Sequence, residues 1–158
     1  MACAALALWG LGRSAQAQSP KAVLVLGDSL SAEYGLKRGS GWVALTEEKL
    51  KAEKVPARVV NASISGDTTS GGRSRLPALL KLHKPSVVVI ELGGNDALRG
   101  LPLGMTRDNL AFMAKAAREA GARVLLLGME MPPNYGATYA KEFRDMFATV
   151  AKTEKAAL

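Results

Sequence analysis

Cysteine and histidine are nearly absent from this sequence. Its 158 residues include one cysteine, Cys3, and one histidine, His83. A single cysteine excludes an internal disulfide framework and a thiolate zinc site, and a single histidine excludes a metal centre built from several imidazoles. We therefore expect a protein that uses neither a metal ion nor another cofactor.

Aromatic residues and long apolar runs are scarce as well. Phe, Trp and Tyr make up 5% of the chain, so its core must be mostly aliphatic. No apolar run approaches the ~20 residues that cross a bilayer, so no integral membrane segment is expected. The composition, 48% hydrophobic and 22% charged, excludes collagen-like, coiled-coil and wholly disordered chains. The length suits one domain with a sizeable core.

The formal net charge of +7 raises the question of a polyanionic partner. Most of the basic residues are spread along the chain, and the densest stretch, 49–58, is interrupted by Glu53 and Pro56. No aromatic residues alternate with them, as a groove for single-stranded nucleic acid would require. We expect solvated surface charge that favours anionic lipid or metabolite substrates, and no nucleic-acid partner.

The first 17 residues have the pattern of a secretory signal peptide. A short apolar run rich in Ala and Leu is followed by Ala15-Gln16-Ala17, the small-x-small form of a cleavage site. The basic residues that usually precede such a run are missing, and the alternative is a first helix of the fold. We predict a signal peptide over 1–17, a domain over 18–158, and a periplasmic or secreted protein.

The rest of the chain alternates short aliphatic runs with longer amphipathic ones, in the order strand, helix, repeated four times. Apolar runs of four or five residues between turn signals predict strands that are buried on both faces. Such a repeat predicts a parallel, doubly wound α/β sheet with helices on both faces. The predicted strands are Ala22–Leu26, Arg58–Ala62, Val87–Ile90 and Val124–Leu127, and the predicted helices are Trp42–Lys54, Leu76–Leu82, Asn109–Ala120 and Tyr139–Lys152. Pro77 would then lie near the first turn of its helix.

Ligands of doubly wound sheets bind beyond the carboxyl ends of the strands, so the loops after the strands are where chemistry is expected. Ser29 follows the first strand and is predicted to start a helix, where free backbone N–H groups point outward. A hydroxyl in that place can attack a carbonyl. The alternative is that Asp28 and Ser29 only cap the helix.

Two further loops supply groups that suit an oxyanion, which needs two or three converging donors. Gly66 lies in the loop after the second strand, where a glycine allows close approach of a backbone N–H. Asn95 follows the third strand and offers a neutral side-chain donor. If those strands flank the first one, all three residues surround one point.

These three blocks resemble the SGNH, or GDSL, hydrolases, and most closely their bacterial thioesterase I, arylesterase and lysophospholipase branch. The similar segments are Gly27-Asp28-Ser29-Leu30-Ser31, Asn61-Ala-Ser-Ile-Ser-Gly66-Asp67, Gly93-Gly94-Asn95-Asp96, Leu76-Pro77-Ala78-Leu79-Leu80 and Pro133-Asn134-Tyr135-Gly136. The resemblance covers the chain from Lys21 to about Lys152. It implies a flavodoxin-like three-layer α/β/α sandwich that hydrolyses small-molecule esters, thioesters or lysophospholipids.

The resemblance also implies roles for individual residues. Ser29 would be the nucleophile and would donate its backbone N–H to the oxyanion. Gly66 would supply a second backbone N–H, and the Asn95 side chain the third donor. The loop over 98–105 would lie across the acyl chain. Glu33 departs from the family, whose members often have Gly there, and would place a carboxylate near the mouth of the site.

One part of the family pattern is missing from these residues. Members carry an Asp-x-x-His near the C-terminus, because a serine hydroxyl needs a base to take its proton. No Asp-x-x-His occurs here, and His83 precedes the third strand, at the amino end of the sheet. A strand of five or six residues would hold it roughly 15–20 Å from Ser29.

We therefore expect a C-terminally truncated esterase sequence in which the last strand, the histidine loop and the final helix are missing. The fourth strand would then be left as a bare apolar edge, which folded proteins avoid. The alternatives are a non-catalytic module that binds acyl chains or anions, and an inactive fragment.

Overall fold

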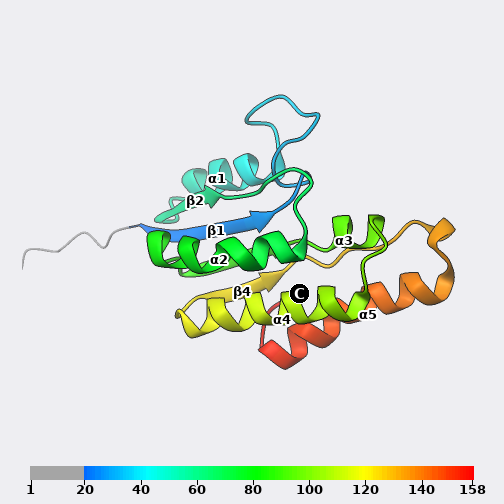
Figure 1. Ribbon diagram of the computed structural model, residues 1–158. Helices are drawn as coiled ribbons and strands as arrows, with labels where there is room; N and C mark the ends of the chain where they lie inside the picture. Colours follow the sequence, from blue (N-terminus) through cyan, green and yellow to red (C-terminus); the bar gives the residue numbers. More distant parts are fainter. Residues whose placement is uncertain (1–19) are drawn as a thin grey trace, which may run out of the picture.

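Four parallel strands form one sheet in the computed structural model, which describes residues 20–158 (Figure 1). The strands are β1 (Lys21–Gly27), β2 (Ala57–Asn61), β3 (Val87–Glu91) and β4 (Arg123–Leu126). Their order, β2-β1-β3-β4, follows the flavodoxin-like arrangement of doubly wound sheets. The predicted α/β fold with a parallel sheet is confirmed, whereas the predicted signal peptide lies outside the described residues.

Helices cover the two faces of the sheet unequally. The side chains of Leu24 and Leu26 point to the larger core, which is formed with α2 (Thr69–His83), α4 (Leu103–Glu119) and α5 (Ala137–Glu154). Val25 points to the other face, where it packs near Val43 of α1 (Trp42–Ala52). Because β1 is buried on both faces, its sequence is apolar at successive positions rather than at alternate ones.

The larger core closes around two phenylalanines of α5. Phe143 and Phe147 are buried, and their ring centroids lie 5.3 Å apart with an interplanar angle of 81°. This edge-to-face geometry is the favoured one for aromatic pairs. The scarcity of aromatic residues is thus partly offset by placing two of them together, against the aliphatic strands and the buried Met113 of α4.

Helix α2 begins at Thr69, seven residues before the predicted start, so Pro77 lies inside the helix and not in its first turn. The glycines Gly71 and Gly72 had indicated a loop. A Cβ atom on Gly72 would lie 2.4 Å from Leu92 Cδ1, so this glycine is required for the close approach of α2 to the residue after β3. The Thr68 hydroxyl caps the helix by accepting from the Gly71 N–H at 3.4 Å.

The segment 98–105 is not the single loop that was expected. Leu98 ends a short helix, α3 (Gly94–Leu98), and Leu103 already belongs to α4, which starts six residues before its predicted start. Pro102 occupies the N-cap position of α4, and its carbonyl accepts from the Met105 N–H at 3.0 Å. A proline with its fixed φ is well suited to the start of a helix.

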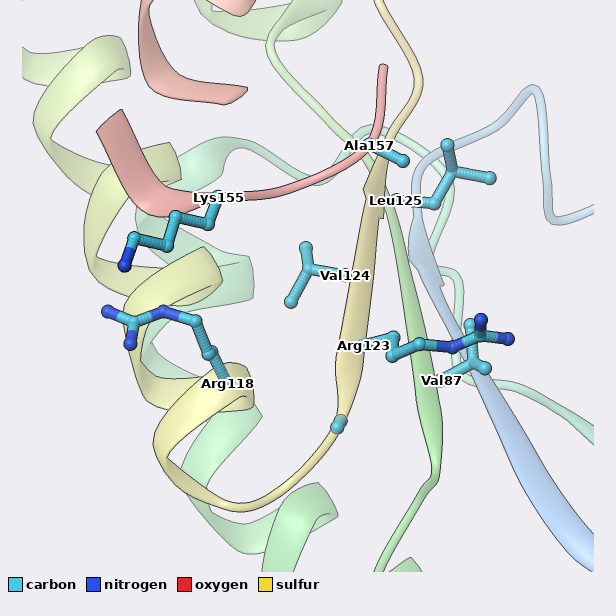
Figure 2. A pocket seen from close by; sticks show the side chains of 8 residues that line it. Val87, Arg118, Arg123, Val124, Leu125, Lys155 and Ala157 are labelled. Carbon is cyan, nitrogen blue, oxygen red and sulfur yellow. The ribbon is translucent and has the colours of Figure 1, made fainter. Parts of the chain in front are cut away.

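The edge of β4 is partly covered by the end of the described chain. The Ala157 N–H donates to the Val124 carbonyl at 2.9 Å, and the Ala157 carbonyl accepts from the Leu126 N–H at 2.9 Å. This parallel bridge shows that the prediction of a bare edge was wrong for the middle of β4. Beside the bridge lies a cleft of about 580 Å³, lined by Val124 and by the cations Arg118, Arg123 and Lys155 (Figure 2).

We expect the Ala157 bridge to stabilise the fold and to protect β4. The Ala157→Pro substitution removes the N–H that bonds to the Val124 carbonyl, which should lower the free energy of unfolding by about 1–2 kcal/mol. It should also promote aggregation through the uncovered edge. Urea denaturation and sedimentation velocity measure the two effects. Leu158→Pro is the matched control, because the Leu158 N–H donates no hydrogen bond within residues 20–158; equal losses in both variants would contradict the assignment.

Candidate active site

The loops after β1, β2 and β3 meet at the carboxyl end of the sheet, the end to which the strand arrows point in Figure 1. The Asn95 side chain joins them, since its Nδ2 donates to Asp28 Oδ2 and to the Asp67 carbonyl, both at 2.9 Å. Asp28 is next to Ser29 in the chain, and Asp67 is next to Gly66. The structure therefore brings the three predicted site residues together.

The sequence analysis predicted that Ser29 starts a helix, but in the structure Ser29 lies in a tight turn. The Ala32 N–H donates to the Asp28 carbonyl at 2.9 Å, but the Tyr34 N–H reaches back to the Ser29 carbonyl at 3.2 Å, so no regular helix follows. Glu33 has a φ of 60°, a left-handed conformation that ends the turn. The Asp28 carboxylate accepts from the Leu30 N–H at 3.0 Å, so it stabilises this turn and does not cap a helix, as the alternative interpretation had it.

Several backbone N–H groups at this end of the sheet make no hydrogen bond within residues 20–158, and those of Ser29 and Gly66 are among them. Neither the Ser29 N–H nor the Gly66 N–H donates a hydrogen bond to any residue in the described range, and the Ser29 hydroxyl has no partner there either. Gly66 has a φ of 79°, a conformation that strains any residue with a side chain. Such unpaired donors are what an anion binding beside the Ser29 hydroxyl would require.

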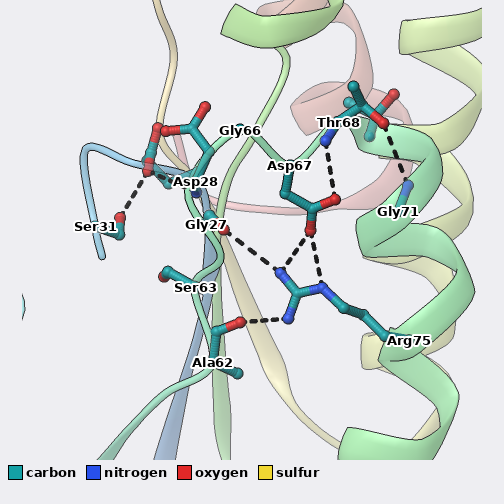
Figure 3. A network of polar contacts seen from close by, with 12 residues as sticks. Gly27, Asp28, Ser31, Ala62, Ser63, Gly66, Asp67, Thr68, Gly71 and Arg75 are labelled. Carbon is teal, nitrogen blue, oxygen red and sulfur yellow. Dashed lines mark hydrogen bonds and ion pairs between the residues drawn. The ribbon is translucent and has the colours of Figure 1, made fainter. Parts of the chain in front are cut away.

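Arg75 of α2 holds the loops after β1 and β2 in place (Figure 3). Its Nε donates to Asp67 Oδ2 at 2.9 Å, and its Nη2 lies 2.8 Å from the same oxygen. Nη1 donates to the Ala62 carbonyl, and Nη2 donates to the Gly27 carbonyl at 3.4 Å. Sequence reasoning missed this residue, because Arg75 lies just before the predicted helix Leu76–Leu82 and was counted with the basic residues spread over the surface.

Asp96 fixes the short helix that carries Asn95. The carboxylate is fully buried and accepts from the Thr69 N–H at 2.9 Å, from the Thr69 hydroxyl at 2.5 Å and from the Thr106 hydroxyl at 3.3 Å. Asn109 of α4 in turn donates to the Thr69 hydroxyl at 3.1 Å. A buried carboxylate with this many donors is well satisfied, so it ties α3 to α2 and α4.

Glu91, the last residue of β3, is a buried acid beneath the Ser29 turn. Its Oε2 accepts from the Ser31 hydroxyl at 2.7 Å and from the Asp28 N–H at 3.3 Å, while the buried Oε1 has no partner among residues 20–158. Burial raises the pKa of Glu91 to about 7, and the nearby Asp28 charge adds to the shift. Burial also raises the pKa of Asp28. The sequence analysis ended the third strand at Ile90 and assigned Glu91 no role.

The Glu33 carboxylate does not face the mouth of the site, which corrects the expectation from the sequence. It accepts from the Gly39 N–H at 2.9 and 3.0 Å and from the Gly41 N–H at 2.8 Å. These bonds hold the pKa of Glu33 below its usual value and fold the loop back on itself. Glu33 therefore shapes the chain between β1 and α1.

His83 lies at the opposite end of the sheet from Ser29, where the sequence had placed it. It is the last residue of α2, and its carbonyl accepts from Arg58 Nη2 near the start of β2 at 3.4 Å. Because the chain has one histidine, no imidazole lies near Ser29. Within residues 20–158 there is also no cluster of His, Cys, Asp and Glu side chains that would hold a metal ion.

The fold is a flavodoxin-like parallel α/β sheet, and the three converging loops place a serine, Ser29, at the carboxyl end of its first strand. Residues 25–158 match the GDSL-like lipase/acylhydrolase family, and the chain belongs to this family of carboxylic ester hydrolases. No helix in the described part of the chain is long and apolar enough to cross a membrane.

Similar proteins carry esterase names. The chain is 54% identical over 156 residues to Esterase TesA of Pseudomonas aeruginosa, which covers 99% of this chain and 75% of that protein. It is 42% identical to Thioesterase 1/protease 1/lysophospholipase L1 of Escherichia coli, over 87% of this chain and 64% of that one.

Solved structures show the same fold. The crystal structure of TesA superposes with a TM-score of 0.86 at 55% identity, covering 87% of this chain and 77% of the other. The psychrotrophic esterase EstA from Pseudoalteromonas, inhibited by monoethylphosphonate, gives a TM-score of 0.83 at 43% identity, covering 87% and 75%.

The raised pKa of Glu91 predicts a loss of stability as the pH rises. Between about pH 4.5 and pH 7 the unfolded chain releases this proton while the folded protein keeps it, so folding becomes less favourable through that window. The Glu91→Gln side chain cannot titrate. Between pH 4 and pH 8 the parent should therefore lose more free energy of unfolding than the variant does, and the difference between the two losses should be on the order of 1–2 kcal/mol.

Urea denaturation at several pH values measures this difference. Glu48→Gln is the matched control, because Glu48 is exposed on α1 and makes no ion pair with another described residue. A Glu91→Gln profile parallel to that of the parent would show that Glu91 is already ionised in the folded protein at low pH.

Proposed function

We propose that this protein hydrolyses carboxylic esters through an acyl-enzyme on Ser29. The observation that carries the proposal is the pair of free N–H groups, on Ser29 and Gly66, at the place where the Ser29 hydroxyl also lacks a partner. Attack by the hydroxyl oxygen on an ester carbonyl produces an oxyanion, which these two groups would stabilise. Loss of the alcohol or thiol then leaves the acyl group on Ser29 for water to remove.

Asn95 is the proposed third donor, although both of its N–H bonds already have acceptors. One goes to the Asp28 carboxylate and the other to the Asp67 carbonyl. The amide is therefore held in place before substrate arrives, which is the preorganisation that oxyanion stabilisation requires. We propose that the developing negative charge competes with the neutral Asp67 carbonyl for the second N–H, while the bond to Asp28 keeps the amide oriented.

Apolar side chains beside the site support an acyl substrate. Leu30, Ile64 and Leu98 come from the three loops that carry Ser29, Gly66 and Asn95, and they are 67%, 53% and 60% exposed. Each exposes apolar surface that an acyl chain would cover. We propose small-molecule esters, thioesters or lysophospholipids as substrates and, from the sequence of residues 1–17, a periplasmic or secreted protein with its domain over 18–158.

The base that activates Ser29 is not among the residues near it. The single histidine is at the far end of the sheet, and the family resemblance assigns the base to an Asp-x-x-His that this sequence does not contain. We propose that the 158 residues alone turn over ester poorly or not at all, because general-base catalysis contributes about 10²–10⁴. The second candidate, a non-catalytic module that binds acyl chains, rests on this same observation.

A chimaera distinguishes the two candidates. The part of the P. aeruginosa esterase that follows its match to this chain, where the family resemblance places an Asp-x-x-His, is joined after Leu158. Hydrolysis of a short activated ester is then followed. We expect turnover in the chimaera, and none when Ser29→Ala removes the nucleophile, because no acyl-enzyme can then form. Equal hydrolysis with and without the Ser29 hydroxyl would refute the mechanism, and a folded chimaera without activity would favour the binding module.

In the same chimaera, Asn95→Ala should lower kcat by about 10²–10³ with a smaller change in KM, because an oxyanion donor acts mainly in the transition state. His83→Ala is the control and should leave kcat unchanged, since His83 lies beyond reach of Ser29. Loss of activity in a folded His83→Ala protein would contradict the placement of the site.

A further inference from the structure

The loop over residues 33–41, here called the 33–41 loop, projects from the carboxyl end of the sheet. Figure 1 shows this part of the chain, between β1 and α1, rising to the top of the view on the α1 side of the sheet. Two large apolar side chains lie on it, Tyr34 at 78% and Leu36 at 56% exposure. Single exposed apolar residues are common, but a pair on a projecting loop beside an active site is informative.

The 33–41 loop is an ordered structure and not a slack connection. The Glu33 carboxylate binds the N–H groups of Gly39 and Gly41 across the base of the loop. The Leu36 N–H donates to the Glu33 carbonyl at 3.0 Å, and the Ser40 N–H donates to the Lys37 carbonyl at 3.1 Å. The loop therefore presents its tip in a fixed conformation, which lowers the entropy cost of binding a partner.

The charges on the loop select the kind of partner. Lys37 and Arg38 follow the apolar pair, are exposed, and form no ion pair with any acidic group among residues 20–158. The one acidic residue of the loop, Glu33, is engaged by the loop's own N–H groups. An aromatic and an aliphatic side chain next to two exposed cations is the chemistry of an anchor at an anionic lipid surface.

The position of the loop connects this surface with the site. The Tyr34 N–H donates to the Ser29 carbonyl at 3.2 Å, so the loop begins within the Ser29 turn. A hollow is lined by Ala32, Glu33, Leu36 and Arg38 on one side and by Asn61 and Ser63, at the start of the loop that carries Gly66, on the other. A surface that the loop touches would therefore lie beside the place where an ester must enter.

We propose that the 33–41 loop docks the protein on an anionic lipid bilayer, with the Ser29 site turned towards the lipid. Tyr34 and Leu36 enter the interface between headgroups and acyl chains, and Lys37 and Arg38 bind lipid phosphates. The orientation of the site towards substrate rests on the proposed esterase function. The docking itself does not, because it requires no catalysis and can be measured on the 158-residue chain.

Tryptophan quenching locates the surface that touches the bilayer. The Tyr34→Trp protein is mixed with vesicles of phosphatidylglycerol and phosphatidylcholine that carry bromine on their acyl chains. The matched protein carries Leu82→Trp, since Leu82 is 73% exposed on α2 near the opposite end of the sheet. We expect quenching of the new tryptophan at position 34 and not at position 82. The reverse pattern, or no quenching at position 34, overturns the proposal.

Vesicle co-sedimentation measures how much the apolar and the basic side chains of the 33–41 loop each contribute to lipid affinity. Leu36→Ser should weaken binding by about tenfold, the effect of withdrawing part of a leucine side chain from an apolar phase. Lys37→Gln and Arg38→Gln should each weaken binding to anionic vesicles by about fivefold and leave binding to pure phosphatidylcholine unchanged.

Leu82→Ser and Lys84→Gln are the controls at the far end of the sheet, and circular dichroism verifies the fold of each variant. Equal losses in the loop variants and the controls would show that lipid binding is not a property of the loop. Since no assay of hydrolysis enters these measurements, docking can fail while the proposed esterase function stands, and the reverse also holds.

Discussion

The ion pair between Arg75 and Asp67 is the contact on which the geometry of the site depends. The guanidinium group also bonds to the carbonyls of Gly27 and Ala62, so one side chain of α2 holds the ends of two neighbouring strands. Asp67 then offers its own carbonyl to Asn95, which reaches across to Asp28. The free N–H groups of Ser29 and Gly66 are adjacent in sequence to these anchored residues, so their positions follow from the ion pair.

Two acidic side chains lie close together at this site, and their burial favours the neutral, protonated form of each. Asp28 and Glu91 are both buried beside Ser29, and burial raises the pKa of each. A fully ionised pair would oppose formation of an oxyanion a few residues away. With its pKa near 7, Glu91 is largely protonated in mildly acidic solution. Its carboxyl group can then still bond to the Asp28 N–H, while the site carries one negative charge less.

The strands, and the meeting of the loops that carry Ser29, Gly66 and Asn95, could be predicted because their signals are local. Apolar runs predict β1 and β3, and the glycine, serine and asparagine residues directly after strands predict which loops meet at the carboxyl end of the sheet. Arg75, Asp96 and Glu91 could not be predicted, because their roles depend on carbonyls and hydroxyls far away in the sequence. The start of α2 was missed for a related reason: Gly72 is small to fit against Leu92, a contact that sequence alone does not reveal.

The close approach at Gly72 has a consequence for how variation in this protein should be interpreted. Gly72 lies one helical turn before Arg75 on the same helix, and a Cβ atom there would lie 2.4 Å from Leu92 Cδ1 and 3.1 Å from Met113 Sδ. A side chain at this position would require either a shift of these two core side chains or a movement of α2 away from the sheet, which would carry the guanidinium with it. A substitution in the core would thus act as a change in the site, and selection for function would extend inward to residues that never meet a substrate.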